Sequence, residues 1–155
     1  MTEQEIAEER DFVTVVTAGQ VFGLNLDRVR DVFMPRGLSP VPLAPPEVAG
    51  LLNLRGRIVT AVDLRRRLGL GPHHGSTAPV AVGIEDRGEH YGLIVDAFGE
   101  VLRLPRSRRE TNPVNLDERW ATICDGVYQL EDGLMVVIDV DKVLAFDRVA
   151  SRADG

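Results

Sequence analysis

The chain of 155 residues contains one cysteine, has only 5% aromatic residues and shows no excess of positive charge. The single cysteine, Cys124, excludes an intrachain disulfide and fits a reducing compartment. The net charge of −6 argues against general binding to nucleic-acid phosphates or to anionic lipid. No apolar run approaches the roughly 18 residues that a membrane span needs, and the acidic N-terminus lacks the apolar core of a signal peptide. We therefore expect a cytoplasmic protein with no direct membrane contact.

Catalytic and metal-ligating patterns are also missing from the sequence. His73 and His74 lie in a Gly/Pro-rich loop, 69–77, with no other ligand type clustered beside them, so no metal site is expected. Cys124 has no histidine nearby in sequence, which favours a buried, inert thiol. Because no nucleophile–base pair or pair of carboxylates can be assembled, the sequence predicts a protein that is not an enzyme and uses no cofactor.

Short apolar runs separated by turn signals every 8–12 residues indicate an all-β protein. The runs 58–62 and 134–138 are continuously apolar, which predicts strands covered on both faces. Two pairs of runs are joined by short polar connections and are predicted to be hairpins, 12–17 with 21–26 and 80–84 with 91–95.

The most informative feature is an internal repeat. Phe22-Gly23-Leu24 recurs as Tyr91-Gly92-Leu93, 69 positions later, and Asp31-Val32 recurs as Glu100-Val101 at the same offset. A second block, 50–68, recurs 76 positions later, and the difference fits a loop around 106–119 that is longer in the second half. A duplicated unit of about 65 residues, mostly strand, predicts two small barrels packed together.

The repeat suggests a division of the chain into a polar tail (1–11), a first barrel (12–69), a second barrel (78–146) and a second polar tail (147–155). Exchange of strands between the barrels is left open.

Several residues have expected structural roles. Asp63 and Asp139 occupy equal places before short helical stretches, where each is predicted to cap the helix by accepting free N–H groups. Gly50, Gly56 and Gly126 bracket strands, as expected for turns with positive φ or for close approaches of the backbone.

Three segments together resemble the CheW family of chemotaxis coupling proteins. They are the Phe-Gly-Leu strand with its Tyr-Gly-Leu repeat, the stretch 50–65 containing Asn53-Leu54-Arg55-Gly56, and the second-half segments around 101–105 and 125–140. The resemblance covers about residues 12–146 in order. It implies two SH3-like five-stranded barrels with short helices and a groove between them. It also implies a scaffold that binds the cytoplasmic tip of chemoreceptors and the regulatory domain of the histidine kinase CheA, in arrays with other CheW copies.

The resemblance further implies a receptor-binding site. Arg55 corresponds to the arginine of the family's N-L-R-G motif, Asp31 to its acidic partner, which is commonly a glutamate, and Val29 to an apolar contact. An arginine held by a carboxylate presents its guanidinium in a fixed orientation, and Val29 or Val32 would supply buried area. Asn53 is a second candidate that alternatively hydrogen-bonds its own turn. Without the resemblance, Arg55 and Asp31 are read as a solvated pair worth ~0–1 kcal/mol.

Two alternatives remain open. One is a related module that binds receptors but not the kinase, as an insulator. The other is a small barrel that binds nucleic acid or sugar, for which the basic clusters 65–67 and 106–109 supply charge but the scarcity of aromatic residues argues against base stacking. Trp120 is expected in the core, and His90 is expected to be exposed at a strand edge.

Overall fold

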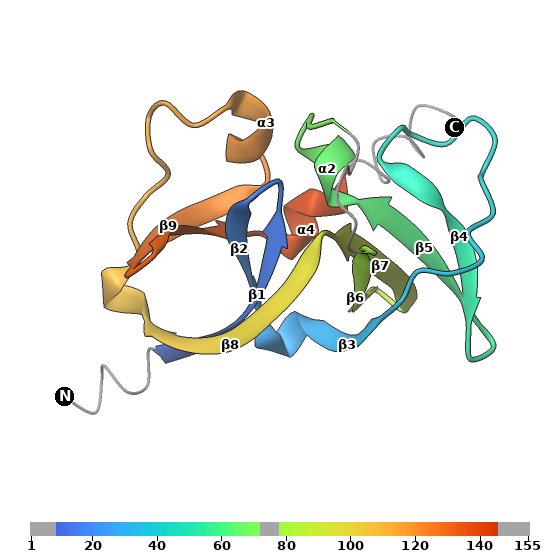
Figure 1. Ribbon diagram of the computed structural model, residues 1–155, viewed down its shortest axis with the longest axis horizontal. Helices are drawn as coiled ribbons and strands as arrows, with labels where there is room; N and C mark the ends of the chain where they lie inside the picture. The colour runs from blue at the N-terminus through green and yellow to red at the C-terminus, as the bar shows by residue number, and fades with distance from the viewer. Residues whose placement is uncertain (1–8, 72–77, 146–155) are drawn as a thin grey trace.

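The computed structural model describes residues 9–71 and 78–145, and within them ten strands form two five-stranded sheets. Each sheet curves into a small barrel, and the two barrels lie beside one another (Figure 1). The strands are β1 (Glu9–Thr17), β2 (Gln20–Asn25), β3 (Val29–Phe33), β4 (Val48–Leu54), β5 (Arg57–Asp63), β6 (Val80–Asp86), β7 (Glu89–Val95), β8 (Ala97–Pro105), β9 (Cys124–Leu130) and β10 (Gly133–Ile138).

The two barrels exchange strands between the halves of the chain. Barrel A has the order β8-β1-β2-β10-β9, and barrel B has the order β3-β6-β7-β5-β4. Since β6–β10 are the repeat equivalents of β1–β5, the two orders become identical when each strand is replaced by its equivalent. Each barrel therefore combines the first two strands of one half with the last three strands of the other.

This exchange corrects the division expected from the sequence. The ranges 12–69 and 78–146 mark the repeats but do not correspond to separate barrels, because β2 pairs in parallel with β10 and β7 pairs in parallel with β5. The expected N-terminal tail is also too long by three residues, since β1 begins at Glu9 and Asp11 pairs with Arg103 of β8. The expected C-terminal tail, 147–155, lies outside the described residues.

The helical elements are short. Asp63 precedes α2 (Leu64–Arg67) and accepts the N–H of Arg65 at 2.9 Å, while Asp139 precedes α4 (Val140–Val143) and accepts the N–H of Lys142 at 3.2 Å. Both aspartates thus satisfy a donor that the first turn of a helix leaves free. The remaining helical elements are η1 (Leu26–Arg28), η2 (Arg106–Arg108) and α3 (Glu118–Ala121).

Three apolar clusters hold the fold together. One lies inside barrel A, one lies inside barrel B, and the largest joins side chains of both barrels with those of α2 and α4. Burying each large apolar side chain contributes about 1.5–3 kcal/mol. The barrel interiors follow the repeat, because Leu52, Val59 and Ala61 in barrel B have Tyr128, Met135 and Val137 as equivalents in barrel A.

Trp120 is half-buried and packs against the shared cluster, with its ring 5.4 Å from that of Phe22, so the expected core position is only partly met. The apolar runs 58–62 and 134–138 are covered less completely than expected. Ile58 is 61% exposed and Leu134 is 42% exposed, because both lie at barrel rims beside the turns that start β5 and β10.

Gly50 and Gly126 occupy equivalent places where another segment crosses a strand closely. A Cβ atom on Gly50 would lie 2.7 Å from the carbonyl oxygen of Ser39, and one on Gly126 would lie 2.7 Å from that of Glu110. Ser39 and Glu110 each exchange two backbone hydrogen bonds with the residue after the glycine. Gly50 and Gly126 therefore serve close approaches that help to close the barrels, whereas Gly56 lies in a tight turn.

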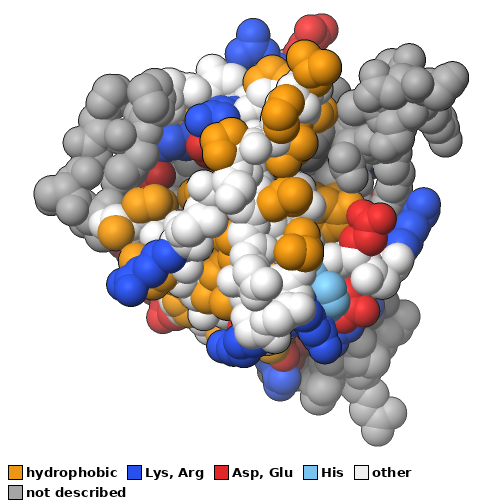
Figure 2. Space-filling view, turned by 90° about the vertical axis from the view of Figure 1, so that its right-hand side faces the viewer, with side chains coloured by type: hydrophobic (Ala, Val, Ile, Leu, Met, Phe, Trp, Pro, Cys, Tyr) orange, Lys and Arg blue, Asp and Glu red, His pale blue; other side chains and the backbone are white. Residues whose placement is uncertain are grey.

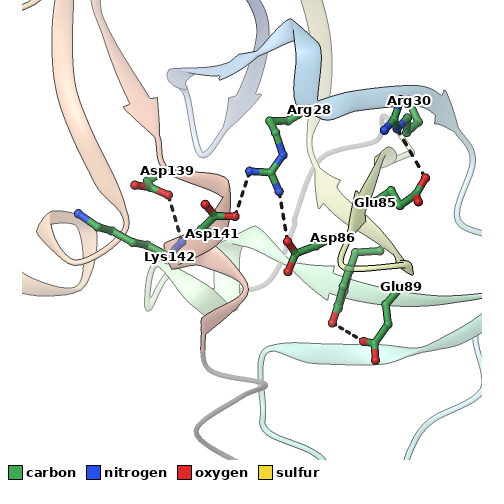
Figure 3. A network of polar contacts seen from close by, with 9 residues as sticks. Arg28, Arg30, Glu85, Asp86, Glu89, Asp139, Asp141 and Lys142 are labelled. Atoms are coloured by element: carbon green, nitrogen blue, oxygen red, sulfur yellow. Dashed lines mark hydrogen bonds and ion pairs between the residues drawn. The ribbon is translucent and has the colours of Figure 1, made fainter.

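Charged side chains also link the barrels. Arg28, just before β3, contacts Asp141 of α4 at 3.0 Å and Asp86 at the end of β6 at 3.5 Å (Figure 3). The α4 helix follows β10 of barrel A, so this network connects that barrel to the β6–β7 turn of barrel B.

Candidate partner-binding site

The site expected from the sequence is built on the β4–β5 turn. Arg55 and Gly56 have φ values of +53° and +83°, as in the type I′ turns that suit two-residue hairpins. The Asn53 side-chain oxygen accepts the N–H of Gly56 at 2.9 Å. Asn53 therefore supports its own turn, and the turn projects the Arg55 side chain into solvent.

Arg55 reaches across to β3. Its guanidinium lies 3.6 Å from a carboxylate oxygen of Asp31, and the two side chains are 77% and 33% exposed. The aspartate is thus long enough to form the pair although the family commonly has glutamate. Gly83 of β6 makes this possible, because a Cβ atom there would collide with the Asp31 carboxylate. A pair this exposed contributes only ~0–1 kcal/mol to stability, so its effect is mainly on orientation.

The pair stands at the rim of a surface groove of about 400 Å³ at one end of barrel B, here called groove B. Two further polar contacts border it: Arg30 with Glu85 at 3.8 Å, and Arg57 with His90 at 3.2 Å. The groove is lined by Arg30, Asp31, Phe33, Leu54, Arg55, Arg57, Val59, Gly83, Ile84, Glu85, His90 and Tyr91.

The sequence predicts that His90 is exposed at a strand edge, and this prediction is wrong. The residue is half-buried and lies on β7, which has β6 on one side and β5 on the other. Its position is nevertheless accessible from the groove.

Val29 and Val32 do not line groove B with the Arg55–Asp31 pair. Val29 is half-buried and packs against the shared core, and a register shift separates it from Asp31. Val32 is 39% exposed, and it follows Asp31 on a strand whose successive side chains point to opposite faces. The two valines thus belong to the β3 strand that carries Asp31 but not to the groove itself.

Exposed apolar side chains accompany Val32 on two strands that run along the lower edge of the view in Figure 1. Val101 of β8, the repeat equivalent of Val32, is 50% exposed, and Phe98 of the same strand is 42% exposed. The strands β3 and β8 are also the outer members of their sheets. Sequence reasoning missed Phe98 and Val101 as surface candidates, although the repeat pairs Val101 with Val32.

Barrel A has an equivalent groove with different chemistry, here called groove A. It encloses about 750 Å³ and is bordered by Glu100, Glu131 and Asp132. Glu100 is the repeat equivalent of Asp31, and Glu131 is the equivalent of Arg55. The pairing of arginine with a carboxylate is therefore specific to groove B.

A further apolar surface lies between β3 and β4. Figure 2 shows hydrophobic side chains gathered over this connection and β4. Leu43 is fully exposed and has a φ of +63°, and Met34 and Val41 are 42% and 37% exposed. A leucine in this left-handed conformation is strained, and exposed apolar patches of this kind often mark interaction surfaces.

The remaining candidates are Cys124 and the histidines of the 69–77 loop. Cys124 is 2% exposed, and burial raises the pKa of its thiol to about 12. Among residues 9–71 and 78–145, no three His, Cys, Asp or Glu side chains gather as metal ligands would. His73 and His74 lie outside these ranges. In the same part of the chain, no helix has the length and apolar character needed to cross a membrane.

Two strand-exchanged, SH3-like barrels with an open charged groove define a binding module. The family model of the CheW-like domain matches residues 11–148, so the chain belongs to the CheW-like domain family. The chain is 25% identical over 134 residues to the chemotaxis protein CheW of Rhizobium meliloti, covering 86% of each chain. It is 24% identical to CheW of Bacillus subtilis, covering 96% of this chain and 94% of that protein.

A solved structure shares the fold. The crystal structure of the scaffolding protein TtCheW from Thermoanaerobacter tengcongensis superimposes with a TM-score of 0.73 and 27% sequence identity, covering 83% of this chain and 88% of that one. These similarities confirm the expected family and the all-β, two-barrel fold. They do not favour a nucleic-acid or sugar-binding module.

Proposed function

We propose that this protein is a chemotaxis adaptor that couples chemoreceptor signalling tips to a CheA-type histidine kinase. The observation that carries the proposal is the Arg55–Asp31 pair, held at the rim of groove B in a chain that aligns with CheW proteins over most of its length. Its chemistry is recognition only, and it acts in the cytoplasm beneath the membrane.

The receptor-binding site comprises Arg55 and Asp31 at the rim of groove B and, around the free edge of the outer strand β3, Val32 on the opposite face of that strand. Arg55 is exposed enough to donate to carbonyl or carboxylate groups of a receptor helix, and Asp31 limits the orientations of its guanidinium. Val32 offers apolar area that a helix would bury. Val29 and Asn53 contribute indirectly, by packing beneath β3 and by fixing the turn.

An adaptor also needs a second surface. The exposed segment around Leu43 lies between β3 and β4, and its exposed apolar residues Met34, Val41 and Leu43 do not line groove B, which supports binding of the kinase regulatory domain or of another CheW copy in an array. An insulator, by contrast, would bind receptor alone.

Reconstitution of receptor, kinase and adaptor tests the proposal. The parent protein is expected to make kinase activity depend on receptor, and Arg55→Ala is expected to weaken receptor binding about 3- to 10-fold while the free energy of unfolding changes by less than about 1 kcal/mol. Pull-down with the kinase alone identifies an insulator, which would fail to bind it. Unaltered receptor binding by Arg55→Ala, or loss of folding, would contradict the site assignment.

A further inference from the structure

Arg57 and His90 form an unusual contact inside groove B. Arg57 begins β5, His90 is the second residue of the neighbouring strand β7, and the Arg57 guanidinium nitrogen lies 3.2 Å from Nε2 of His90. Among the described residues, Arg57 has no carboxylate within the 4.0 Å of an ion pair. Two nitrogen groups therefore face one another at the groove, and an imidazole nitrogen can accept from a guanidinium only while that nitrogen carries no proton.

The other charged groups near His90 are already engaged. Glu85 of β6 lies opposite His90 in the strand register but pairs with Arg30 of β3. Glu89, the preceding residue on β7, accepts the hydroxyl of Tyr91 at 2.8 Å (Figure 3). His90 itself is half-buried and is reached from groove B, which it lines.

We propose that Arg57 and His90 together bind a carboxylate of the segment that occupies groove B, and that protonation of His90 tightens this binding. The inference rests on the proposed function and names the chemistry of the partner: an acidic side chain that follows the part of the helix held by Arg55. Once His90 is protonated, Arg57 and His90 are two cations in contact, and a carboxylate placed between them accepts a charge-assisted hydrogen bond from each.

Groove A lacks the Arg57–His90 pair, and this difference lets a partner distinguish groove B from groove A. The repeat equivalents of Arg57 and His90 are Gly133 and Val21, and groove A is bordered by three carboxylates. An acidic segment is therefore attracted to groove B and repelled from groove A, so the charge pattern selects one end of a pseudo-symmetric molecule.

The direction of the pH effect follows from the charges. Histidine normally changes charge between pH 5 and 8, whereas partner carboxylates stay ionised there. A bound carboxylate favours protonated His90, so linkage requires that protonation favour the bound state. Affinity should rise as the pH falls from 8 to 6.

The test measures binding of a chemoreceptor signalling-tip fragment by calorimetry at pH 6 and pH 8. The parent is expected to bind about 3- to 10-fold more tightly at pH 6. His90→Gln should remove this difference, and Arg57→Gln should weaken binding at both pH values by a similar factor. A matched control, His73→Gln with His74→Gln, retains the pH dependence because the chain contains only these two other histidines.

The outcomes separate this inference from the proposed function. Absence of binding by the parent at either pH overturns the receptor-binding proposal. Binding by the parent that is independent of pH, or that is unchanged in both Arg57→Gln and His90→Gln, leaves the adaptor proposal standing and overturns the assignment of Arg57 and His90. Glu131→Gln in groove A serves as a second control and should bind as the parent does.

Discussion

Arg65 and Asp96 form a two-bond ion pair, with nitrogen–oxygen distances of 2.7 and 2.9 Å, that fastens α2 to the connection between β7 and β8. Both side chains are only 17% exposed. Asp96 also accepts the N–H of Ala18 at 2.8 Å, so the same carboxylate holds the β1–β2 turn of barrel A. The repeat equivalent of Arg65 is Asp141, which pairs with Arg28, and the charges of helix and partner are thus interchanged at the second junction.

Breaking the first junction should destabilise the protein. Asp96→Asn is expected to lower the free energy of unfolding by about 1–3 kcal/mol, because it leaves the partly buried Arg65 without its carboxylate. Asp141→Asn is the matched control, since Asp141 is 60% exposed and its loss should cost at most about 1 kcal/mol. Urea titration measures both, and equal effects would show that the junctions contribute alike.

Gly83 should prove necessary for the receptor-binding pair. Gly83→Ala places a methyl group where the Asp31 carboxylate now lies, so Arg55 loses its partner while the fold remains. We expect receptor binding to weaken about as much as in Arg55→Ala, and the double variant to be no weaker than either single one. Gly71→Ala is the control, because its added methyl group meets no atom within 4 Å. Additive losses in the double variant would argue against a shared mechanism.

We expect Leu43 to lower the stability of the fold and to strengthen binding of the kinase. Asparagine tolerates the left-handed conformation better than leucine, so Leu43→Asn is expected to raise the free energy of unfolding by about 0.5–1 kcal/mol and to weaken kinase binding. Thermal unfolding and pull-down with the kinase measure the two effects. A destabilised variant would show that the leucine packs in solution, and undiminished kinase binding would remove this surface from the proposal.

Cys124 should report unfolding. Because burial raises the pKa of its thiol from 9.0 to about 12, the folded chain keeps a proton that the unfolded chain loses within that window. The free energy of unfolding should therefore fall as the pH rises from about 9 to 12, and more steeply for the parent than for Cys124→Ala. Alkylation of the native protein at pH 8 is expected to be slow and to accelerate with urea at the unfolding midpoint. Rapid alkylation without urea would show that the thiol is accessible in the folded state.

The sequence predicts the repeat, the barrels and the helix caps because each depends on local patterns. Asp63 and Asp139 cap helices through bonds to residues two or three positions away, and the apolar runs need only their own alternation. The pairing of β2 with β10, by contrast, does not depend on a local pattern. The choice between β5 and β10 depends on two strands with the same apolar pattern, so the offsets alone do not reveal that the halves exchange strands.

The candidate site was only partly predictable for a similar reason. Arg55 and Asp31 were found through a motif, and the structure brings them together. The irregular register between Val29 and Asp31 changes which β3 side chains share a face, and a single sequence does not encode that shift visibly. No sequence pattern marks Gly83 as part of the site, because its role is to leave space for the side chain of Asp31, which is 52 positions away.

The exchange of strands has a consequence for how such a molecule arises. One repeat by itself lacks the partners for its own strands, but two identical repeats would supply them to each other across a twofold axis. Two copies of a half-length chain would thus contain the equivalent of every strand in both barrels. Joining two copies in one polypeptide makes the assembly independent of protein concentration. It also allows the sequences of the two copies to diverge. In this chain the two grooves differ accordingly: groove B is lined by arginines, and groove A by carboxylates.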